Sequence, residues 1–220
     1  MPMDLEPLLH SLADKVEGRC YGKYRGYVED NKDPKKIGRL RLRVPRVFGK
    51  EVITGWATPC VPYGGAEGEG MVFIPEKDAG VWVEFEEGDS DRPLWVGTFW
   101  SAPGDVSEMP LHNQPDGSEE SEYQDPLTRK IIRTKKGHTI QFEDKDGEEM
   151  ITIVHWKDKD GGEKNVITLD ADGIKITDYT ENVIEMKSDA FTITSKVAFT
   201  IDAAGQAMEL IADTIDFTKG

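Results

Sequence analysis

The last third of the chain alternates apolar and polar residues in short pairs. Two apolar residues flank one other residue at 140/142, 151/153, 167/169, 174/176, 184/186, 191/193, 199/201, 208/210 and 215/217. This alternation is typical of strands that bury one face only. From Ile167 onward, the first members of successive pairs lie 7 to 10 residues apart. The pattern therefore predicts a repeat with one short strand and one turn in each unit.

A strand with two inward side chains cannot bury its own apolar face. Such a stack needs neighbouring strands, or other copies of the chain, to close its core. Asn-Gly turns, which would favour the long hairpins of a compact sandwich, do not occur here. The repeat favours an elongated β-structure that is shared between chains, and a compact monomeric sandwich or solenoid is the alternative.

The region before this repeat predicts short strands separated by turns rich in glycine, proline and aspartate. The expected strands are residues 21–28, 39–44, 52–58, 71–74, 81–86 and 94–99. Five or six short strands in about eighty residues suit a small barrel. In the second strand Arg39, Arg41 and Arg43 face away from the leucines, which indicates either a solvated strand face or a basic surface for nucleic acid.

Two further segments differ from this all-β pattern. Residues 4–16 place Leu5, Leu8, Leu9, Leu12 and Val16 on one stripe of a predicted helix, which either packs on its own domain or docks on a partner. Residues 101–127 lack periodicity and predict an extended linker, in which we expect Glu119, Glu120 and Glu122 to be solvated.

Composition limits the possible functions. The 220 residues carry a net charge of −15, with 37% hydrophobic and 31% charged residues. Such a charge disfavours binding to nucleic acid through its phosphates. No run of about 18 apolar residues predicts a transmembrane helix, and no signal peptide is expected. Cys20 and Cys60 are predicted to be free thiols.

The sequence shows no pattern for catalysis or metal binding. The histidines, at positions 10, 112, 138 and 155, are widely separated and have no Cys or carboxylate at ligand spacing. The acidic loop at residues 86–91 lacks the order of a calcium loop. Nucleophile elbows, phosphate-binding glycine loops and zinc-protease motifs are also missing. We expect no enzymatic activity, no cofactor and no metal.

Five ordered motifs resemble one known family. They are residues 38–45 (GRLRLRVP), 55–62 (GWATPCVP), 73–75 (FIP), 80–93 (GVWVEFEEGDSDRP) and 95–99 (WVGTF), followed later by 136–144 (KGHTIQFED). These motifs resemble the spike family of contractile injection machines. The family comprises the central spikes of contractile phage tails (baseplate assembly protein V), VgrG of type VI secretion, and the spikes of phage-tail-like particles.

The resemblance implies an all-β fold, with an antiparallel Greek-key OB-fold barrel and a triple-stranded β-helix needle wound from three chains. The expected domains are an N-terminal helical segment at 1–18, the OB-fold at 19–100, a linker at 101–129 and the needle at 130–220. Relatives that hold iron at the tip use a His-X-His pair near the C-terminus, and this chain lacks one.

The resemblance also implies partners. The trimer would contact a hub or tube-initiator protein above, through Leu5, Leu8, Leu9 and Leu12. Because the chain lacks the histidine pair of the iron-bearing tips, we expect a separate PAAR-like tip protein below, in contact with Ile215 and Phe217. The trimer would pierce the target envelope mechanically, without stable membrane insertion or nucleic acid, after assembly in the producing cell's cytoplasm. The predicted trimer core consists of Ile167, Leu169, Ile174, Ile176, Ile184, Met186, Phe191, Ile193, Phe199, Ile201, Met208, Leu210, Ile215 and Phe217. The alternative function is an OB-fold module that binds nucleic acid or carbohydrate.

Overall fold

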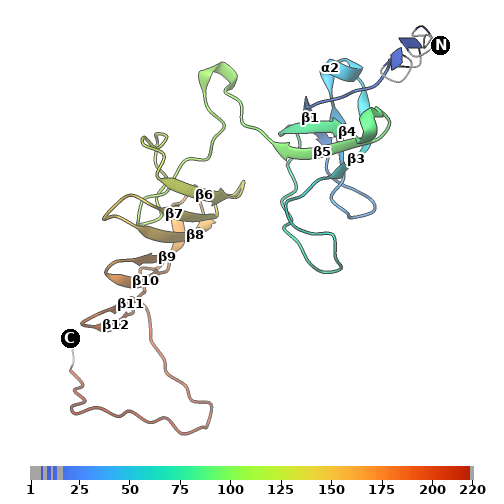
Figure 1. Cartoon of the computed structure of the whole chain (residues 1–220). Coiled ribbons are helices and arrows are strands. Elements are labelled where there is room, and N and C mark those ends of the chain that lie inside the picture. The colour runs from blue at the N-terminus through green and yellow to red at the C-terminus, as the bar shows by residue number, and fades with distance from the viewer. Residues whose placement is uncertain (1–5, 7–8, 11, 14–16, 219–220) are drawn as a thin grey trace, which may run out of the picture. The chain divides into compact units, whose positions relative to one another are not determined.

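A computed structural model describes residues 6, 9–10, 12–13 and 17–218. The chain divides into two compact units, Met1–Met109 and Pro110–Gly220. Both units are built from β-strands with little helix (Figure 1). The predicted all-β class is therefore confirmed.

The first unit is a closed five-stranded barrel. Its strands are β1 (Tyr24–Asp30), β2 (Leu40–Arg43), β3 (Ile53–Pro59), β4 (Gly80–Phe85) and β5 (Pro93–Thr98), in the order β1-β2-β3-β5-β4 around the barrel. The resemblance implied a purely antiparallel barrel, and one pair differs. β3 and β5 run parallel, with Thr58 opposite Leu94, and this pair closes the barrel. Closure leaves no free strand edge in the sheet.

The barrel core follows directly from the alternation in its strands. Leu40 and Leu42 of β2 point inward and are fully buried, together with Val28 of β1 and Val81 and Val83 of β4. The Trp95 indole also lies in this core and donates its Nε1 hydrogen to the Gly38 carbonyl at 3.0 Å. Apolar residues at every second position therefore fill the interior, as the period of a strand requires.

Asp33 organises the connection between β1 and β2. Its carboxylate accepts hydrogen bonds from the backbone N–H groups of Lys35 and Ile37 at 3.0 Å each. It also pairs with the Arg39 guanidinium at 2.7 Å, while its side chain is only 3% exposed. Arg39 holds the pKa of this carboxyl well below its usual range, helped by the backbone N–H groups and opposed by burial.

The predicted strand at residues 71–74 does not form. Met71, Val72 and Phe73 lie in the connection between β3 and β4 and are 46%, 79% and 60% exposed. Since the five-stranded barrel is already closed, no sheet edge is available to pair with this segment. Short helical turns, α2 (Pro45–Phe48), η1 (Glu86–Gly88) and η2 (Pro103–Asp105), complete the unit.

The N-terminal helix is only partly described. Residues 6, 9, 10, 12 and 13 are helical. Leu9 and Leu12 are 59% and 51% exposed. Leu5, Leu8 and Val16 lie outside the described residues.

The second unit contains one seven-stranded antiparallel sheet. Its strands are β6 (Arg129–Arg133), β7 (Thr139–Glu143), β8 (Met150–Asp158), β9 (Glu163–Asp170), β10 (Gly173–Thr177), β11 (Val183–Lys187) and β12 (Phe191–Thr194). Each strand pairs with the strands next to it in sequence, so the sheet is a simple meander (Figure 1). The six apolar pairs from Ile140 to Ile193 each occupy a separate strand, as the repeat predicted.

The last three apolar pairs do not lie in strands. Residues 195–218 contain no strand, although Phe199, Ile201, Met208, Leu210, Ile215 and Phe217 continue the repeat. Every described strand of the sheet pairs within its own chain. The intertwined β-helix therefore stays a prediction.

Candidate functional site

One face of the seven-stranded sheet carries an unbroken row of isoleucines. The strand register places Ile132 opposite Ile140, Ile140 opposite Ile153, and Ile153 opposite Ile167. The row continues through Ile176, Ile184 and Ile193 to the last strand. One isoleucine from each of the seven strands thus lies in the same line across the sheet.

A second apolar row runs beside the first. Phe142 lies opposite Ile151, and Ile151 lies opposite Leu169. The row continues through Ile174, Met186 and Phe191. We call the two rows together the apolar face.

The apolar face is not covered by any other part of the chain that the structure describes. Ile140 and Phe142 are each 40% exposed, and Phe191 and Ile193 at the last strand are 64% and 49% exposed. Soluble proteins rarely leave such a continuous apolar strip open to water unless it binds something. The face is therefore the strongest candidate for an interaction surface.

The opposite face of the sheet is buried over β7 to β9, although it is the more polar one. Thr139, Gln141, Thr152, Val154 and Thr168 on this face are all less than 9% exposed. Alternation alone predicted burial of the isoleucine face. The difference arises because residues 110–119, which we call the strap, cross the polar face.

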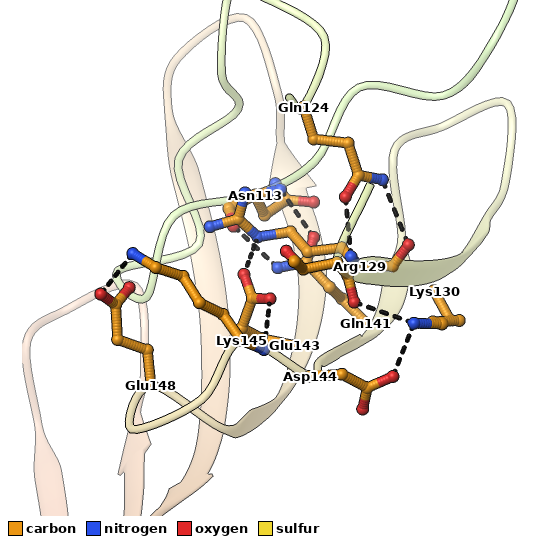
Figure 2. A network of polar contacts seen from close by, with 10 residues as sticks. Asn113, Gln124, Arg129, Lys130, Gln141, Glu143, Asp144, Lys145 and Glu148 are labelled. Carbon is orange, nitrogen blue, oxygen red and sulfur yellow. Dashed lines mark hydrogen bonds and ion pairs between the residues drawn. The ribbon is translucent and has the colours of Figure 1, made fainter. Parts of the chain in front are cut away.

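A pair of hydrogen bonds between amide groups attaches the strap to the sheet (Figure 2). The Asn113 backbone N–H donates to the Gln141 side-chain oxygen, and the Gln141 amide donates to the Asn113 carbonyl, both at 2.9 Å. The Asn113 side chain donates to the Gly117 carbonyl at 2.9 Å and is 1% exposed. Gly117 itself lies so close to Val166 that a Cβ atom there would be 2.6 Å from its Cγ2 atom.

Charged side chains complete the attachment of the strap. Arg133 donates to the Leu111 carbonyl at 3.2 Å and pairs with Glu119. Arg129 and Glu143 form an ion pair at 2.7 Å beneath the strap (Figure 2). Glu119 was expected to be solvated, but its side chain is only 27% exposed and pairs with Arg133 and Lys159.

His112 of the strap is 7% exposed, and its Nδ1 atom has no hydrogen-bond partner among the described residues. Burial lowers the pKa of His112, and the nearby Arg129 charge lowers it further. The neutral imidazole is therefore the form that the folded unit favours.

A polar row borders the apolar face beside the isoleucines. It lies two residues from the isoleucine row, within or directly beside strands β7 to β12, and consists of His138, His155, Asn165, Asp178, Asn182 and Ser195. The His138 and His155 rings stack with centroids 5.0 Å apart. Asn182 donates to Asp178 at 2.8 Å. Sequence analysis missed this row because its members are separated by turns of different length.

The structure brings together only part of the predicted trimer core. Eight of those residues, Ile167, Leu169, Ile174, Ile176, Ile184, Met186, Phe191 and Ile193, lie in the two rows. The predicted tip contacts, Ile215 and Phe217, are 47% and 89% exposed in residues 195–218. Ile132 was missed, because it follows Ile131 directly and breaks the alternation.

The three barrel arginines do not form an open basic surface. Arg39 pairs with Asp33, and Arg43 pairs with Glu29 at 2.9 Å. Arg41 donates to the Thr54 carbonyl at 3.4 Å. Each guanidinium thus has a partner in the barrel.

Comparison with known families identifies the barrel. Residues 24–100 match the family model of the type VI secretion system/phage-baseplate injector OB domain. The chain contains an injector OB domain of this family. The match spans the five barrel strands and confirms the resemblance to baseplate spikes. No individual curated protein matches the chain.

The match indicates a structural role in a phage baseplate or type VI secretion injector. The sheet of the second unit lies outside the matched residues. Within the described part of the chain, no cluster of three or more His, Cys, Asp or Glu side chains is arranged to hold a metal ion. In the same part, no helix has the length and apolar character to cross a membrane.

Proposed function

We propose that this protein is the homotrimeric central spike of a contractile injection machine. The injector OB domain supports the setting in such a machine. The uncovered apolar face supports assembly through the second unit, because one row of seven apolar side chains and a second row of six must be shielded from water. The observation that carries the proposal is the unbroken isoleucine row.

The width of the sheet is compatible with closure by three copies. His138, strand β7 and Asp144 together form seven residues, whose six steps along the strand span about 20 Å. An equilateral triangle with sides of about 20 Å has walls about 6 Å from its axis, near half the usual spacing of packed sheets of about 10 Å. Isoleucine side chains from three walls would fill such an interior.

Strands β6 to β12 of each copy would then form one of the three walls, and these strands would run roughly perpendicular to the three-fold axis. The tail at residues 195–218 carries three more apolar pairs, and it would complete the needle by pairing between chains. Continuous backbone pairing would give the needle its stiffness. The sheath would supply the work of piercing, and the spike would enter the target envelope without stable insertion.

The ends of the spike would carry its partners. Exposed Leu9 and Leu12 would contact the hub protein, and Ile215 and Phe217 would contact a PAAR-like tip protein. Assembly would take place in the producing cell's cytoplasm before the particle acts. The spike would need neither catalysis nor a cofactor for this mechanical task.

Light scattering tests the trimer directly. The purified protein should have a mass near three times 24.6 kDa. A monomer or dimer at micromolar concentration would refute the proposal.

A matched pair of variants tests which face is inside. Ile193→Lys puts an ammonium group into the apolar interior, at a cost of several kcal/mol per chain. Thr192→Lys is its control, because Thr192 lies opposite Glu185 on the other face and lysine can pair with it there. Trimer formation should fail for Ile193→Lys and persist for Thr192→Lys. Equal effects would contradict the assignment of the faces.

A further inference from the structure

The apolar face has two chemically different borders at the level of β7 and β8. One border, the histidine flank, consists of His138 and His155. The other, the acidic flank, consists of Asp144 and Glu149, at the opposite ends of the same two strands. All four residues lie an even number of positions from the apolar pairs, so they share the apolar face.

The histidine flank presents two N–H donors. His138 Nδ1 accepts a hydrogen bond from the Trp156 backbone N–H at 3.2 Å. Asn165 uses its oxygen to accept from the Tyr179 N–H, so its amide nitrogen donates to His155 Nδ1 at 3.1 Å. Both neutral rings therefore carry their hydrogen on Nε2. Neither Nε2 atom has a partner among the described residues.

Positive charge lies close to these rings. The turn between β6 and β7, on the same side of the sheet, contains the exposed Lys135 and Lys136. This flank is therefore suited to a carboxylate partner.

The acidic flank borders a hollow on the apolar face. The hollow has a volume of about 460 Å³, and Phe142, Ile151, Leu169, Asp144 and Glu149 are among its lining residues. Glu149 is exposed and has no ion-pair partner within the described residues. Asp144 pairs only with Lys130, and both side chains of that pair are 61% exposed. The hollow thus offers an apolar floor with carboxylates at its rim.

Three-fold symmetry determines which flanks meet. In a closed ring of three identical walls, the contact between neighbours is heterologous, so each histidine flank must face an acidic flank. The three-fold rotation that relates the copies does not move any residue along the axis. Residues at the same height in the sheet therefore meet, apart from the small offset that strand tilt introduces.

We propose that His138 and His155 of one copy insert into the Asp144–Glu149 hollow of the next copy and fix the register of the trimer. This inference rests on the proposed trimer. The imidazole rings would cover the apolar floor, and their Nε2–H groups would donate to the carboxylates. Repeated three times, the contact would set the height of each wall relative to its neighbours.

A double-mutant cycle tests the contact, with the rate of trimer loss in urea as its readout. His155→Glu places a carboxylate against the acidic flank, and Glu149→Lys reverses the charge of that flank. Residues 149 and 155 of one chain are about 20 Å apart along β8, so they cannot interact directly within a chain. Each single variant should lose its trimer about tenfold faster, whereas the double variant should return to within about threefold of wild type.

Asp189→Lys provides the matched control. Asp189 lies on the same side of the sheet as Glu149, in the turn between β11 and β12, three strands further along. It should show no coupling to His155→Glu.

The outcomes separate the inference from the proposed function. If the wild type is trimeric and the effects of His155→Glu and Glu149→Lys multiply without rescue, the flank contact is refuted and the trimer stands. Equal rescue by Asp189→Lys would also refute it, since only net charge would then matter. If His155→Glu fails to assemble, rescue by Glu149→Lys supports the contact and absence of rescue refutes it. A monomeric wild type refutes both proposals.

Discussion

Gln141 makes the two shortest neutral hydrogen bonds that join the strap to the sheet. Gln141 makes two hydrogen bonds to the backbone of Asn113, each 2.9 Å long, at a site where both residues are at most 3% exposed. The Asn113 side chain donates to the Gly117 carbonyl within the strap and accepts one bond from Arg133 of β6, at 3.3 Å. Gln141→Leu leaves that bond in place, so it should loosen the strap without changing the register of the strands.

The size of the effect follows from these two bonds. A neutral hydrogen bond contributes about 1 kcal/mol net, and a buried group left without a partner costs about 1–3 kcal/mol. With two backbone groups affected, we expect strap opening to become easier by about 2–4 kcal/mol. This corresponds to an opening equilibrium shifted by roughly 30- to 1,000-fold, since 1.4 kcal/mol is a factor of ten.

Hydrogen exchange of the peptide that contains Asn113 measures this opening. Gln114→Leu is the matched control, because it makes the same chemical change on the strap where no side-chain hydrogen bond exists in the described structure. Exchange should accelerate strongly in Gln141→Leu and stay near wild type in Gln114→Leu. Indistinguishable exchange in the two variants would show that the paired amides do not hold the strap.

Two further predictions concern acid. The pKa of His112 is lowered from 6.5, mainly by burial and further by Arg129. The unfolded chain therefore binds a proton at His112 more readily than the folded unit does. The second unit should lose stability as pH falls below 6.5. The urea midpoint, followed by Trp156 fluorescence, should depend less on pH between 7 and 5 in His112→Gln, and an unchanged slope would contradict this. The Asp33 carboxyl has a pKa depressed below 3.8, mainly by Arg39, so its contribution is present above pH 3.8 and lost as pH falls through the folded value. Asp33→Asn should lower the urea midpoint of the barrel at pH 7, and below pH 4 the midpoint of the variant should depend less on pH than that of the wild type. Equal midpoints of the variant and the wild type at pH 7 would contradict the stabilising role of Asp33.

Alternation predicted the five barrel strands and β7 to β12, but it missed β6, where Ile131 and Ile132 are adjacent. Leu40 and Leu42 are separated by one arginine, and Ile184 and Met186 by one glutamate, so each segment has only one apolar side as a strand. The motifs around residues 38–99 also indicated the barrel and its family. The segment at 71–74 was an exception, because its apolar residues satisfy the pattern of a strand but find no free edge.

Alternation could not predict which face of the second sheet is covered. Gln141 and Thr152 are polar, and nothing local marks them as buried. They are buried because Asn113, 28 residues before Gln141, satisfies the Gln141 amide across the sheet. Hydrogen bonds between distant segments depend on how the chain returns on itself, and a periodic pattern carries no information about that path.

The sequence by itself determined that residues 140–193 form repeated one-strand units with an apolar side, because the period of a strand is a local property. Only the tertiary structure decided that these sides align in two continuous rows. Alignment depends on the register between neighbouring strands, and the turns that set it range from two residues between β9 and β10 to six between β7 and β8. The same register places His138 beside His155 and Asp144 beside Glu149, so the two flanks exist only in the folded sheet.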